Sequence, residues 1–403
     1  MKICYVATTT HISKNMGDAL GSTTHTMGAA KALCRHGHEV ILVSDMHEGD
    51  GACETIEGVK VYRLLRGIFV SSGSVKRSGA NFLLKRLNPL SALVLGIRIA
   101  EIVRKEGCDA ILERSQSGAA GAVASYVTGR PMLLELIDNL QSRLSLSRAQ
   151  MIFTYTPAML GGRFGEKTVV VDSGYDGEIF RPRKAKAEYD LCYAGSFKEW
   201  DGLEDLVEAA AILHNPKLRF LLVGDGVNYA GIRRLAKIKN VSGNFCFTGK
   251  VALAEVPALI ARARVCIAPF NIRRTKKGGF EKYGYYFSPL KLYEYIACGK
   301  PIITADYPII RKTFSERNGA LFREGSVEAL AEAIKSTLER KDLGAIGRRN
   351  LEYSKRFTWF EVIRPIAAGI EMVCCGATAH ENVCGSAAAA GKVRGKSPEG
   401  AAK

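Results

Sequence analysis

The chain has 403 residues, more than one hydrophobic core usually organises, so its length predicts two domains or three. Its residues are 47% hydrophobic and 24% charged, a composition that suits a globular α/β protein and excludes a fibrous or disordered one. Basic residues outnumber acidic ones by 57 to 40, and the resulting net charge of +17 would attract nucleotides, phosphorylated substrates, acidic lipid surfaces or nucleic acid.

The cysteines and the N-terminal sequence indicate a reducing compartment. Eleven cysteines are scattered from Cys4 to Cys384 without a CxxC pair or the spacing of a zinc site, which favours free thiols. The sequence MKICYVATTT begins directly as a strand and lacks the apolar core of a signal peptide, so we expect a cytoplasmic protein. The most apolar stretch, residues 90–100, is far shorter than the ~20 residues that a membrane-spanning helix needs.

Short apolar runs alternate with segments of helical periodicity, the pattern of βα units that build parallel sheets. The first half predicts six or seven strands, at residues 2–7, 39–44, 59–64, 110–114 and 132–137 and near residues 151 and 169. After Phe180 the charged segment RPRKAKAEYD is typical of an interdomain linker. The pattern then restarts, with strands at residues 190–195, 219–224, 244–249, 265–270 and 302–305. The sequence therefore predicts an α/β fold of two Rossmann-like domains that face a central cleft.

The segment FSPLKLYEYIACGKPII, residues 287–303, carries the sharpest local pattern. Ser288 is a good N-cap and Pro289 a good first helical residue, so we predict a helix that begins there and ends near Gly299. The free amides and the positive dipole end of such a helix suit a diphosphate.

One face of this predicted helix carries Leu290, Lys291 and Glu294. Glu294 lies ~7 Å along the axis from the helix start, about the span from a diphosphate to its ribose. Its carboxylate could thus accept hydrogen bonds from two ribose hydroxyls. For an isolated segment, an amphipathic helix with an exposed Glu–Lys pair is the simpler interpretation.

Other segments of the chain favour the ligand-binding interpretation of this helix. Together with it, they make the sequence resemble the GT-B nucleotide-sugar glycosyltransferases, specifically the retaining family numbered four (glycosyl transferases group 1). The resemblance covers roughly residues 1–370. The matching pieces occur in the family's order: GSTTH, GHEVILVS, VVVDSGYDGEIFRP, CYAGSFKEWDGLEDLVEA, LLVGDG, FTGKV, SPLKLYEYIACGKPII, NGALF and FTWFEV.

The resemblance implies how the chain divides. Residues 1–180 are expected to form an acceptor-binding domain and residues 181–355 a nucleotide-sugar-binding domain. Residues 356–373 are expected to form a helix that crosses back to the first domain. Residues 374–403 are rich in Ala and Gly and cannot bury a core, so we predict a disordered tail.

The resemblance also implies a set of donor-binding residues by position. Glu294 matches the family's ribose-binding glutamate, and the phosphates and the sugar would contact Ser288, Pro289, Leu290 and Lys291. The turn that borders the nucleobase would contain Gly249, Lys250 and Val251. The phosphate-binding loops would contain Gly21, Ser196 and Lys198, although a solvated surface lysine explains Lys198 equally well. Gly21 lacks a Cβ, so its backbone can approach a diphosphate closely.

Three positions depart from the family pattern. Tyr286 stands where many members have a first glutamate, and Asp201 stands where a lysine commonly precedes the glycine of the phosphate loop. A histidine common in the first domain is replaced by Arg114 and Ser115. The missing charge could come from Glu281, Lys282 or Lys291. A branch of the family also lacks the first glutamate, so these departures do not imply inactivity.

Two residues of the first half complete the predicted catalytic set of Lys198, Lys291, His25 and Asp138. His25 could contact the acceptor or the sugar, or it could be a helix-packing residue. Asp138 follows a predicted strand and could bind sugar hydroxyls, or it could cap the next helical turn.

The predicted function is transfer of a sugar from a nucleoside diphosphate sugar to an acceptor hydroxyl, with retention, in glycan or glycolipid biosynthesis. The resemblance implies neither a cofactor nor a metal, and the nucleotide-sugar is a co-substrate. The alternatives are a catalytically silent nucleotide-sugar or glycan-binding protein, and an epimerase or a phosphorylase of the same fold. No nucleic-acid-binding module is recognised, so nucleic acid is not a predicted partner. The nucleobase, the sugar and the acceptor stay open.

The segment from Lys60 to Ala100 suggests where the acceptor is found, because it contains basic residues and no acidic ones. The basic residues are Lys60, Arg63, Arg66, Lys76, Arg77, Lys85, Arg86 and Arg98, interleaved with Phe69, Phe82, Leu83, Leu84, Leu87 and Leu90. A solvated basic face over core helices is one interpretation. The other is a surface that attaches peripherally to an anionic membrane and meets a lipid-linked acceptor.

Overall fold

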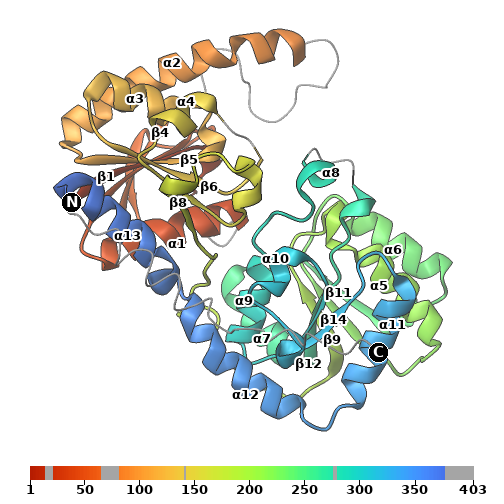
Figure 1. Ribbon diagram of the computed structural model, residues 1–403. Coiled ribbons are helices and arrows are strands. Elements are labelled where there is room, and N and C mark those ends of the chain that lie inside the picture. The colour runs from red at the N-terminus through yellow and green to blue at the C-terminus, as the bar shows by residue number, and fades with distance from the viewer. Residues whose placement is uncertain (14–20, 65–80, 140–141, 276–278, 377–403) are drawn as a thin grey trace, which may run out of the picture.

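The computed structural model describes residues 1–13, 21–64, 81–139, 142–275 and 279–376, with residues 81–89 described by their backbone alone. Two α/β domains, one above the other in Figure 1, each contain one twisted sheet covered by helices on both faces. The predicted α/β class is therefore confirmed.

The first domain is built on an eight-stranded sheet in the order β3-β4-β2-β1-β5-β6-β7-β8. Its strands are β1 (Lys2–His11), β2 (Glu39–Asp45), β3 (Cys53–Ile56), β4 (Val59–Leu64), β5 (Ala110–Arg114), β6 (Met132–Leu136), β7 (Met151–Thr154) and β8 (Thr168–Val170). Only β3 runs antiparallel to its neighbour. The helices are α1 (Gly21–Arg35), α2 (Asn81–Glu106), α3 (Ala120–Thr128) and α4 (Arg143–Arg148), and Figure 1 shows α2, α3 and α4 together on one face.

The second domain is built on a six-stranded parallel sheet in the order β11-β10-β9-β12-β13-β14. Its strands are β9 (Tyr189–Ala194), β10 (Phe220–Val223), β11 (Phe245–Gly249), β12 (Ala263–Ala268), β13 (Ile302–Ala305) and β14 (Gly319–Phe322). Its helices are α5 (Leu203–Leu213), α6 (Tyr229–Ile238), α7 (Val256–Ala261), α8 (Phe280–Tyr283), α9 (Leu290–Ala297), α10 (Pro308–Arg311) and α11 (Val327–Glu339).

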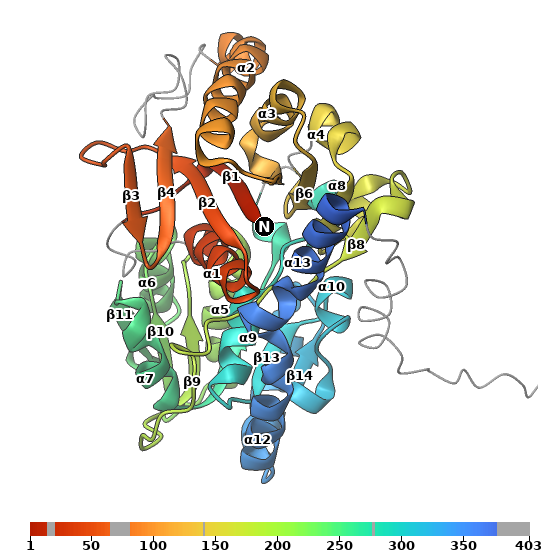
Figure 2. The ribbon, with the colours of Figure 1, turned by 90° about the vertical axis from the view of Figure 1, so that its left-hand side faces the viewer.

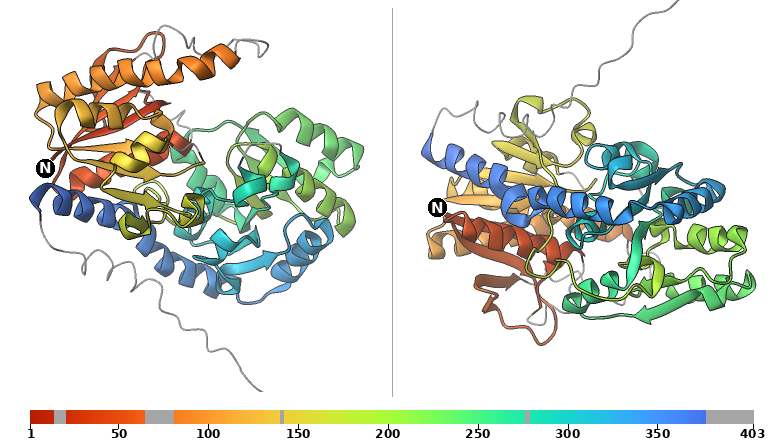
Figure 3. Two further views of the ribbon diagram at one scale, coloured as in Figure 1. Left: turned by 45° about the horizontal axis from the view of Figure 1, so that its top comes forward. Right: turned by 90° about the horizontal axis from the view of Figure 1, so that it is seen from below.

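The chain returns to the first domain at its end. α12 (Leu343–Ser354) lies on the second domain, and α13 (Trp359–Cys375) packs against α1, so the two helices run across both domains (Figures 2 and 3). The Trp359 ring fits against Gly28 of α1, where an added Cβ would lie 2.3 Å from the indole nitrogen. The absence of side chains at Gly28 and Gly174 thus makes the space for this ring.

Three predicted features need correction. The strand count of six or seven for the first domain is wrong, because the short edge strand β3 pairs with β4 through a turn at Glu57 and Gly58, both with positive φ. The prediction also omits β14 from the second domain. The disordered tail was predicted from residue 374, but α13 extends through Cys375, and residues 377–403 lie outside the described part.

The basic segment of the first domain is described only in part, since the side chains of residues 65–89 lie outside the description. Lys60 donates to Glu106 at 2.7 Å. Arg63 is 1% exposed and pairs with Glu54 at 2.6 Å, so it does not belong to a membrane-facing surface. Its guanidinium instead satisfies backbone carbonyls inside the domain.

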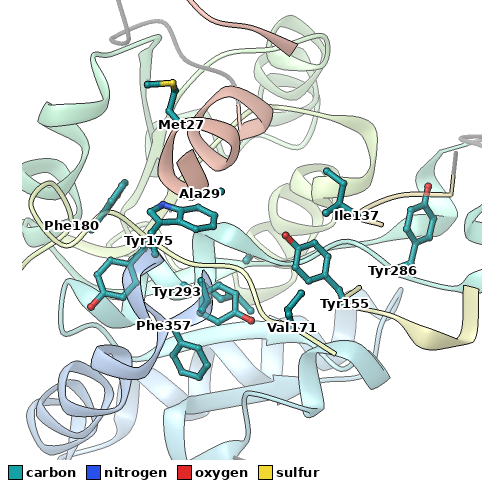
Figure 4. Close-up of a cluster of buried hydrophobic side chains, with 14 of the residues drawn as sticks. Met27, Ala29, Ile137, Tyr155, Val171, Tyr175, Phe180, Tyr286, Tyr293 and Phe357 are labelled. Atoms are coloured by element: carbon teal, nitrogen blue, oxygen red, sulfur yellow. The ribbon is translucent and has the colours of Figure 1, made fainter. Parts of the chain in front are cut away.

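The two domains share a buried cluster, part of which is drawn in Figure 4. Ile137 and Tyr155 come from the first domain, whereas Tyr286 and Tyr293 come from the second. The Tyr293 hydroxyl donates to Asp172 of the first domain at 3.3 Å. This contact places the start of α9 against the first domain.

Candidate functional site

Helix α9 begins at the interface between the domains. The structure corrects its predicted start, because Pro289 occupies the N-cap position with a ψ of 69° and Leu290 is the first helical residue. Ser288 therefore does not cap the helix; its carbonyl accepts from the Leu290 amide at 3.0 Å in a tight turn. The helix ends at Ala297, and Gly299 follows with a positive φ of 71°, near the predicted end.

Gly21, at the start of α1, lies across from α9. A Cβ added to Gly21 would lie 3.7 Å from the Leu290 side chain. The fold thus brings together two predicted donor-binding residues that are 269 positions apart, at the N-termini of helices from different domains. Two N-terminal helix ends at one place favour an anionic ligand.

Lys291 lies in the floor of the second-domain part of the site. Its Nζ donates to the Tyr193 hydroxyl at 2.9 Å and to Asp201 Oδ1 at 2.5 Å. The close approach depends on Gly195, where an added Cβ would lie 3.0 Å from the lysine side chain. Asp201, one of the departures from the family pattern, is therefore the counter-ion of Lys291.

Ser196 and Lys198 lie on the loop that follows β9, and both are exposed. The Ser196 carbonyl accepts from the Tyr193 hydroxyl at 2.7 Å, which ties this loop to the Lys291 contact. The Lys198 ammonium lies 5.2 Å from the Trp200 ring and forms no ion pair with any described residue. Both interpretations of Lys198 stay open, a phosphate ligand and a solvated lysine.

Glu294 is half-buried one turn after the start of α9. Burial raises the pKa of its carboxyl to about 7, and the nearby charge of Lys291 only partly opposes that shift. Within the described ranges its carboxylate has no hydrogen-bond or ion-pair partner. It is a desolvated acceptor group, suited to ligand hydroxyls.

Gly249 ends β11, and Lys250 and Val251 follow it at the same edge of the second sheet. Two strand spacings separate β11 from β9, which places this turn about 10 Å from the loop after β9. Gly249 has a positive φ of 69°, and its carbonyl accepts from the Gly224 amide at 3.0 Å. The spacing suits a base bound at a distance from its phosphates.

His25 is buried inside the first domain and 4% exposed. Its Nε2 lies 2.5 Å from Glu135 Oε1, and its Nδ1 lies 3.1 Å from the Tyr155 hydroxyl. The ring also packs edge-on against Trp359 of α13. The structure therefore favours the packing interpretation over direct contact with sugar or acceptor.

Asp138 follows β6 at the interface between the domains. It accepts from the Ser115 hydroxyl at 3.0 Å, and α4 is capped by Ser142, so Asp138 is not the cap of the next helix. Burial and the nearby Asp138 charge raise the pKa of the Tyr286 hydroxyl to about 12. Asp138 and Tyr286 thus meet across the domain boundary.

Arg114 is a residue whose role sequence reasoning missed. It is buried and donates to the Ser22 carbonyl at 2.9 Å and to the Thr26 hydroxyl, so it holds the first turn of α1 that begins at Gly21. Tyr193 has a similar role for Lys291. Only the three-dimensional fold places these residues, since no local pattern marks them.

Comparison with known proteins finds a family resemblance in the second domain. Residues 188–340 match the family model described as "Glycosyl transferases group 1". This part of the chain is similar to the group 1 glycosyltransferases. The uncharacterized glycosyltransferase MJ1069 of Methanocaldococcus jannaschii is 25% identical over 192 residues, which are 45% of this chain and 44% of that protein. The chain thus matches less than half of the length of this curated relative.

Solved structures extend the likeness to both domains. Sucrose-phosphate synthase from Thermosynechococcus elongatus has a TM-score of 0.72 at 17% identity, over 93% of this chain and 100% of its own. Anabaena Alr3699/HepE in complex with UDP-glucose has a TM-score of 0.66 at 18% identity, over 92% and 99%. The lipopolysaccharide outer core galactosyltransferase WaaB has a TM-score of 0.63 at 13% identity, over 93% and 99%. The fold of the chain is GT-B, as predicted.

Proposed function

We propose that the chain transfers a glycosyl group from a nucleoside diphosphate sugar to an acceptor hydroxyl, with retention of anomeric configuration. The observation that carries this proposal is Glu294, a half-buried carboxylate without a partner in the described structure, one turn along a helix whose start faces Gly21. Its carboxylate binds the ribose hydroxyls, while the diphosphate lies at the starts of α1 and α9.

The proposed reaction needs few catalytic side chains. The bond between the anomeric carbon and the phosphate oxygen breaks, and a bond from that carbon to the acceptor oxygen forms on the same face. The acceptor proton passes to the leaving phosphate, so no separate base is needed. Lys291 stabilises the charge that develops on the diphosphate, and Tyr193 holds the ammonium in place.

Screening nucleotide-sugars by thermal shift, followed by mass detection of the product from the best donor, tests the proposal. UDP-glucose is the first donor to try, because Anabaena Alr3699/HepE was solved with it. We expect turnover to survive EDTA, because the proposed phosphate contacts are Lys291, Lys198 and helix amides. An obligatory divalent ion would contradict this electrostatic assignment.

A second candidate is a nucleotide-sugar-binding protein without turnover. The observation that favours it is the pairing of Lys291 with Asp201, which neutralises the charge of the proposed phosphate-binding cation. Tight donor binding with no product from any acceptor mixture would support this candidate, and an altered sugar on the recovered nucleotide would instead indicate an epimerase.

The acceptor side of the proposal is a peripheral contact with an anionic membrane. Of twelve exposed large apolar side chains among the described residues, seven lie on α2, α3 and α4. We call them the α2–α4 patch: Leu90, Leu93, Val94, Ile97, Tyr126, Val127 and Leu144. Among the described residues, the same helices and the loops beside them carry one exposed acidic residue, Glu101. Their exposed basic residues are more numerous: Arg98, Arg104, Lys105, Arg130 and Arg143.

Apolar side chains in the headgroup region and basic side chains near anionic lipid together give reversible attachment, with each basic residue contributing ~1 kcal/mol. Within the described ranges, none of the helices combines the length and the apolar character needed to cross a bilayer. A peripheral mode is therefore the one proposed.

Cosedimentation with phosphatidylglycerol and phosphatidylcholine liposomes at low and high salt tests this contact. We expect salt-sensitive binding to the anionic vesicles, weakened in Leu93→Asp/Ile97→Asp and unchanged in Ile238→Asp, a control at an exposed apolar site of the second domain. Equal absence of binding to both vesicles would favour a soluble acceptor, and self-association lost in the double variant would assign the patch to a dimer.

A further inference from the structure

A hollow of about 460 Å³ lies at the edge of the first domain that is opposite the donor site. Asp109, Pro131 and Gln150 line it, and they come directly before β5, β6 and β7. These strands are parallel, so the hollow lies at their amino ends. A strand of five residues separates it from the carboxyl ends by roughly 15 Å, so a ligand bound here would not touch the donor.

Two arginines line this space, which we call the Arg130–Arg148 hollow. Arg130 is exposed and follows the end of α3, and Arg148 is the last residue of α4. Arg148 Nη2 donates to the Arg130 carbonyl at 3.3 Å. Among the described residues neither guanidinium forms an ion pair, and Arg148 Nε is buried with no hydrogen-bond partner. Most of their N–H groups are therefore unused inside the protein.

The helices around the hollow explain the position of the two arginines in part. α3 and α4 end at this edge of the sheet, and the negative ends of their dipoles attract cations. Capping accounts for the hydrogen bond from Arg148 to the carbonyl that follows α3. It does not account for two guanidiniums beside one hollow without a counter-ion in the part of the chain that the structure describes.

The charges in the lining select an anionic ligand. Asp109 is the one acidic residue among the described residues that line the hollow, and its Oδ2 accepts from the Lys2 amide at 2.7 Å. The Lys2 ammonium pairs with Glu39 at 2.8 Å and with Glu106 at 3.5 Å. The lining thus carries two guanidiniums against one carboxylate that the backbone holds. A phosphate fits this balance, because its oxygens match the planar fork of a guanidinium through paired hydrogen bonds.

The other lining groups indicate what the phosphate is attached to. The Gln150 side chain is exposed and can donate to and accept from hydroxyls, and Asp109 Oδ1 can accept from a hydroxyl. None of the lining residues that the structure describes is aromatic, so a nucleobase would have no ring on which to stack. No group of described His, Cys, Asp and Glu residues is placed to hold a metal ion. A small polyol phosphate fits a space of this size.

The Arg130–Arg148 hollow borders the α2–α4 patch. Tyr126 and Val127 of that patch lie three or four residues before Arg130, and they are 59% and 40% exposed. The Arg148 guanidinium carbon lies 5.0 Å from the centre of the Tyr126 ring. Exposed apolar side chains thus adjoin two guanidiniums, as acyl chains adjoin the phosphate in a phospholipid. This arrangement favours a phosphate that is carried by a lipid.

We propose that the Arg130–Arg148 hollow is a second ligand site and binds the phosphate of a phosphorylated polyol, carried as the headgroup of an anionic lipid. The two guanidiniums bind the phosphate oxygens, and Gln150 and Asp109 bind the polyol hydroxyls. The site is separate from the donor site and does not depend on the proposed glycosyl transfer. Its lipid source rests on the peripheral membrane contact proposed above.

Phosphorus NMR of dihexanoyl phosphatidylglycerol, below the concentration at which it forms micelles, tests the site with UDP present to fill the donor site. The wild-type chain should broaden the phosphodiester signal. Arg130→Ala and Arg148→Ala should each weaken binding about tenfold or more, as for loss of a charge-assisted hydrogen bond. Arg148→Lys keeps the charge without the fork and should also weaken binding, and the exposed position of Arg130 guards against misfolding. Arg163→Ala, at an exposed arginine elsewhere on the first domain, should bind as the wild-type chain does.

The outcomes separate the site from its alternatives. No broadening by the wild-type chain would overturn the site, and equal weakening in Arg163→Ala would overturn it in favour of general attraction to a basic protein. Unchanged binding in both Arg130→Ala and Arg148→Ala would overturn it and leave helix capping as the role of these residues. Glycerol 1-phosphate bound in preference to the phosphodiester would overturn the lipid source and support the phosphate site.

Calorimetry of UDP binding to the same chains separates this inference from the proposed function. UDP affinity should be the same in the wild-type chain and in the Arg130 and Arg148 variants, because the hollow and the donor site lie at opposite ends of the strands. A wild-type chain that binds phosphatidylglycerol and no nucleotide would support the hollow and contradict the proposed transfer.

Discussion

Two carboxylates, the buried Glu135 of the first domain and the half-buried Glu294 of the second, have pKa values shifted in opposite directions. Glu135 of the first domain lies against His25 and accepts from the Tyr5 hydroxyl at 2.6 Å; burial would raise the pKa of Glu135, but His25 and Arg114 lower it to about 2. For Glu294 of the second domain, burial raises the pKa to about 7, and the nearby charge of Lys291 only partly opposes that shift.

The difference separates a structural group from a binding group. Glu135 is fully engaged inside its domain, so it contributes to folding and has little capacity left for a ligand. Glu294 has lost water without gaining a partner, so a ligand hydroxyl would supply the missing hydrogen bond. The polar groups around Glu135 thus bind one another inside the first domain, whereas Glu294 of the second domain remains available to bind the donor.

The largest expected effect is on the stability of the first domain. In His25→Ala, Glu135 loses its ion-pair partner inside the core, and we expect the free energy of unfolding to fall by about 3–5 kcal/mol. Denaturant titration measures this loss. His214→Ala should change the same quantity by no more than about 0.5 kcal/mol. A His25→Ala chain with wild-type stability and no turnover would restore His25 to the catalytic set.

Lys291 provides the corresponding test in the second domain. Because it is assigned to the leaving diphosphate, Lys291→Ala should lower turnover about 10²–10³-fold while the fold is kept. The substitution also leaves Asp201 buried without its counter-ion, so Lys291→Ala/Asp201→Asn is the matched variant. Single-turnover rates of both variants should be equally low, and a double variant with wild-type turnover would contradict the role of Lys291.

Glu113, a buried carboxylate of the first domain, extends the comparison, because no cation contributes to its pKa shift. It accepts from the Gly121 amide at 3.1 Å at the start of α3, and burial raises its pKa to about 7. The folded chain therefore binds more protons than the unfolded chain between about pH 4.5 and about pH 7, so stability falls as the pH rises through that window.

In the wild-type chain, ionisation of Glu113 should lower the free energy of unfolding by about 3 kcal/mol between about pH 5 and about pH 8. We expect Glu113→Gln to lack this pH-dependent fall. Urea titrations of wild type and variant at both pH values measure the difference. An identical pH dependence in the two proteins would mean that Glu113 is not the titrating group.

Much of this arrangement could be predicted from the sequence, because strong local patterns carried it. Apolar runs located most of the strands, and the SPLKLYEY motif placed Glu294 and Lys291 on a helix at the interface. The role of Asp201 could not be predicted, because its pairing with Lys291 joins residues 90 positions apart. The same holds for His25, whose burial depends on contacts with Glu135, Tyr155 and a helix near the end of the chain.

Calorimetry of nucleotide binding to Glu294→Ala tests the central claim most directly. For the nucleoside diphosphate that wild type binds best, we expect a loss of about 10–100-fold in affinity, since a charge-assisted contact contributes ~1.5–3 kcal/mol. Wild-type affinity should also rise between about pH 6 and about pH 8 as Glu294 ionises, more steeply than in the variant. A folded Glu294→Ala chain that binds every nucleotide as tightly as wild type would contradict the account.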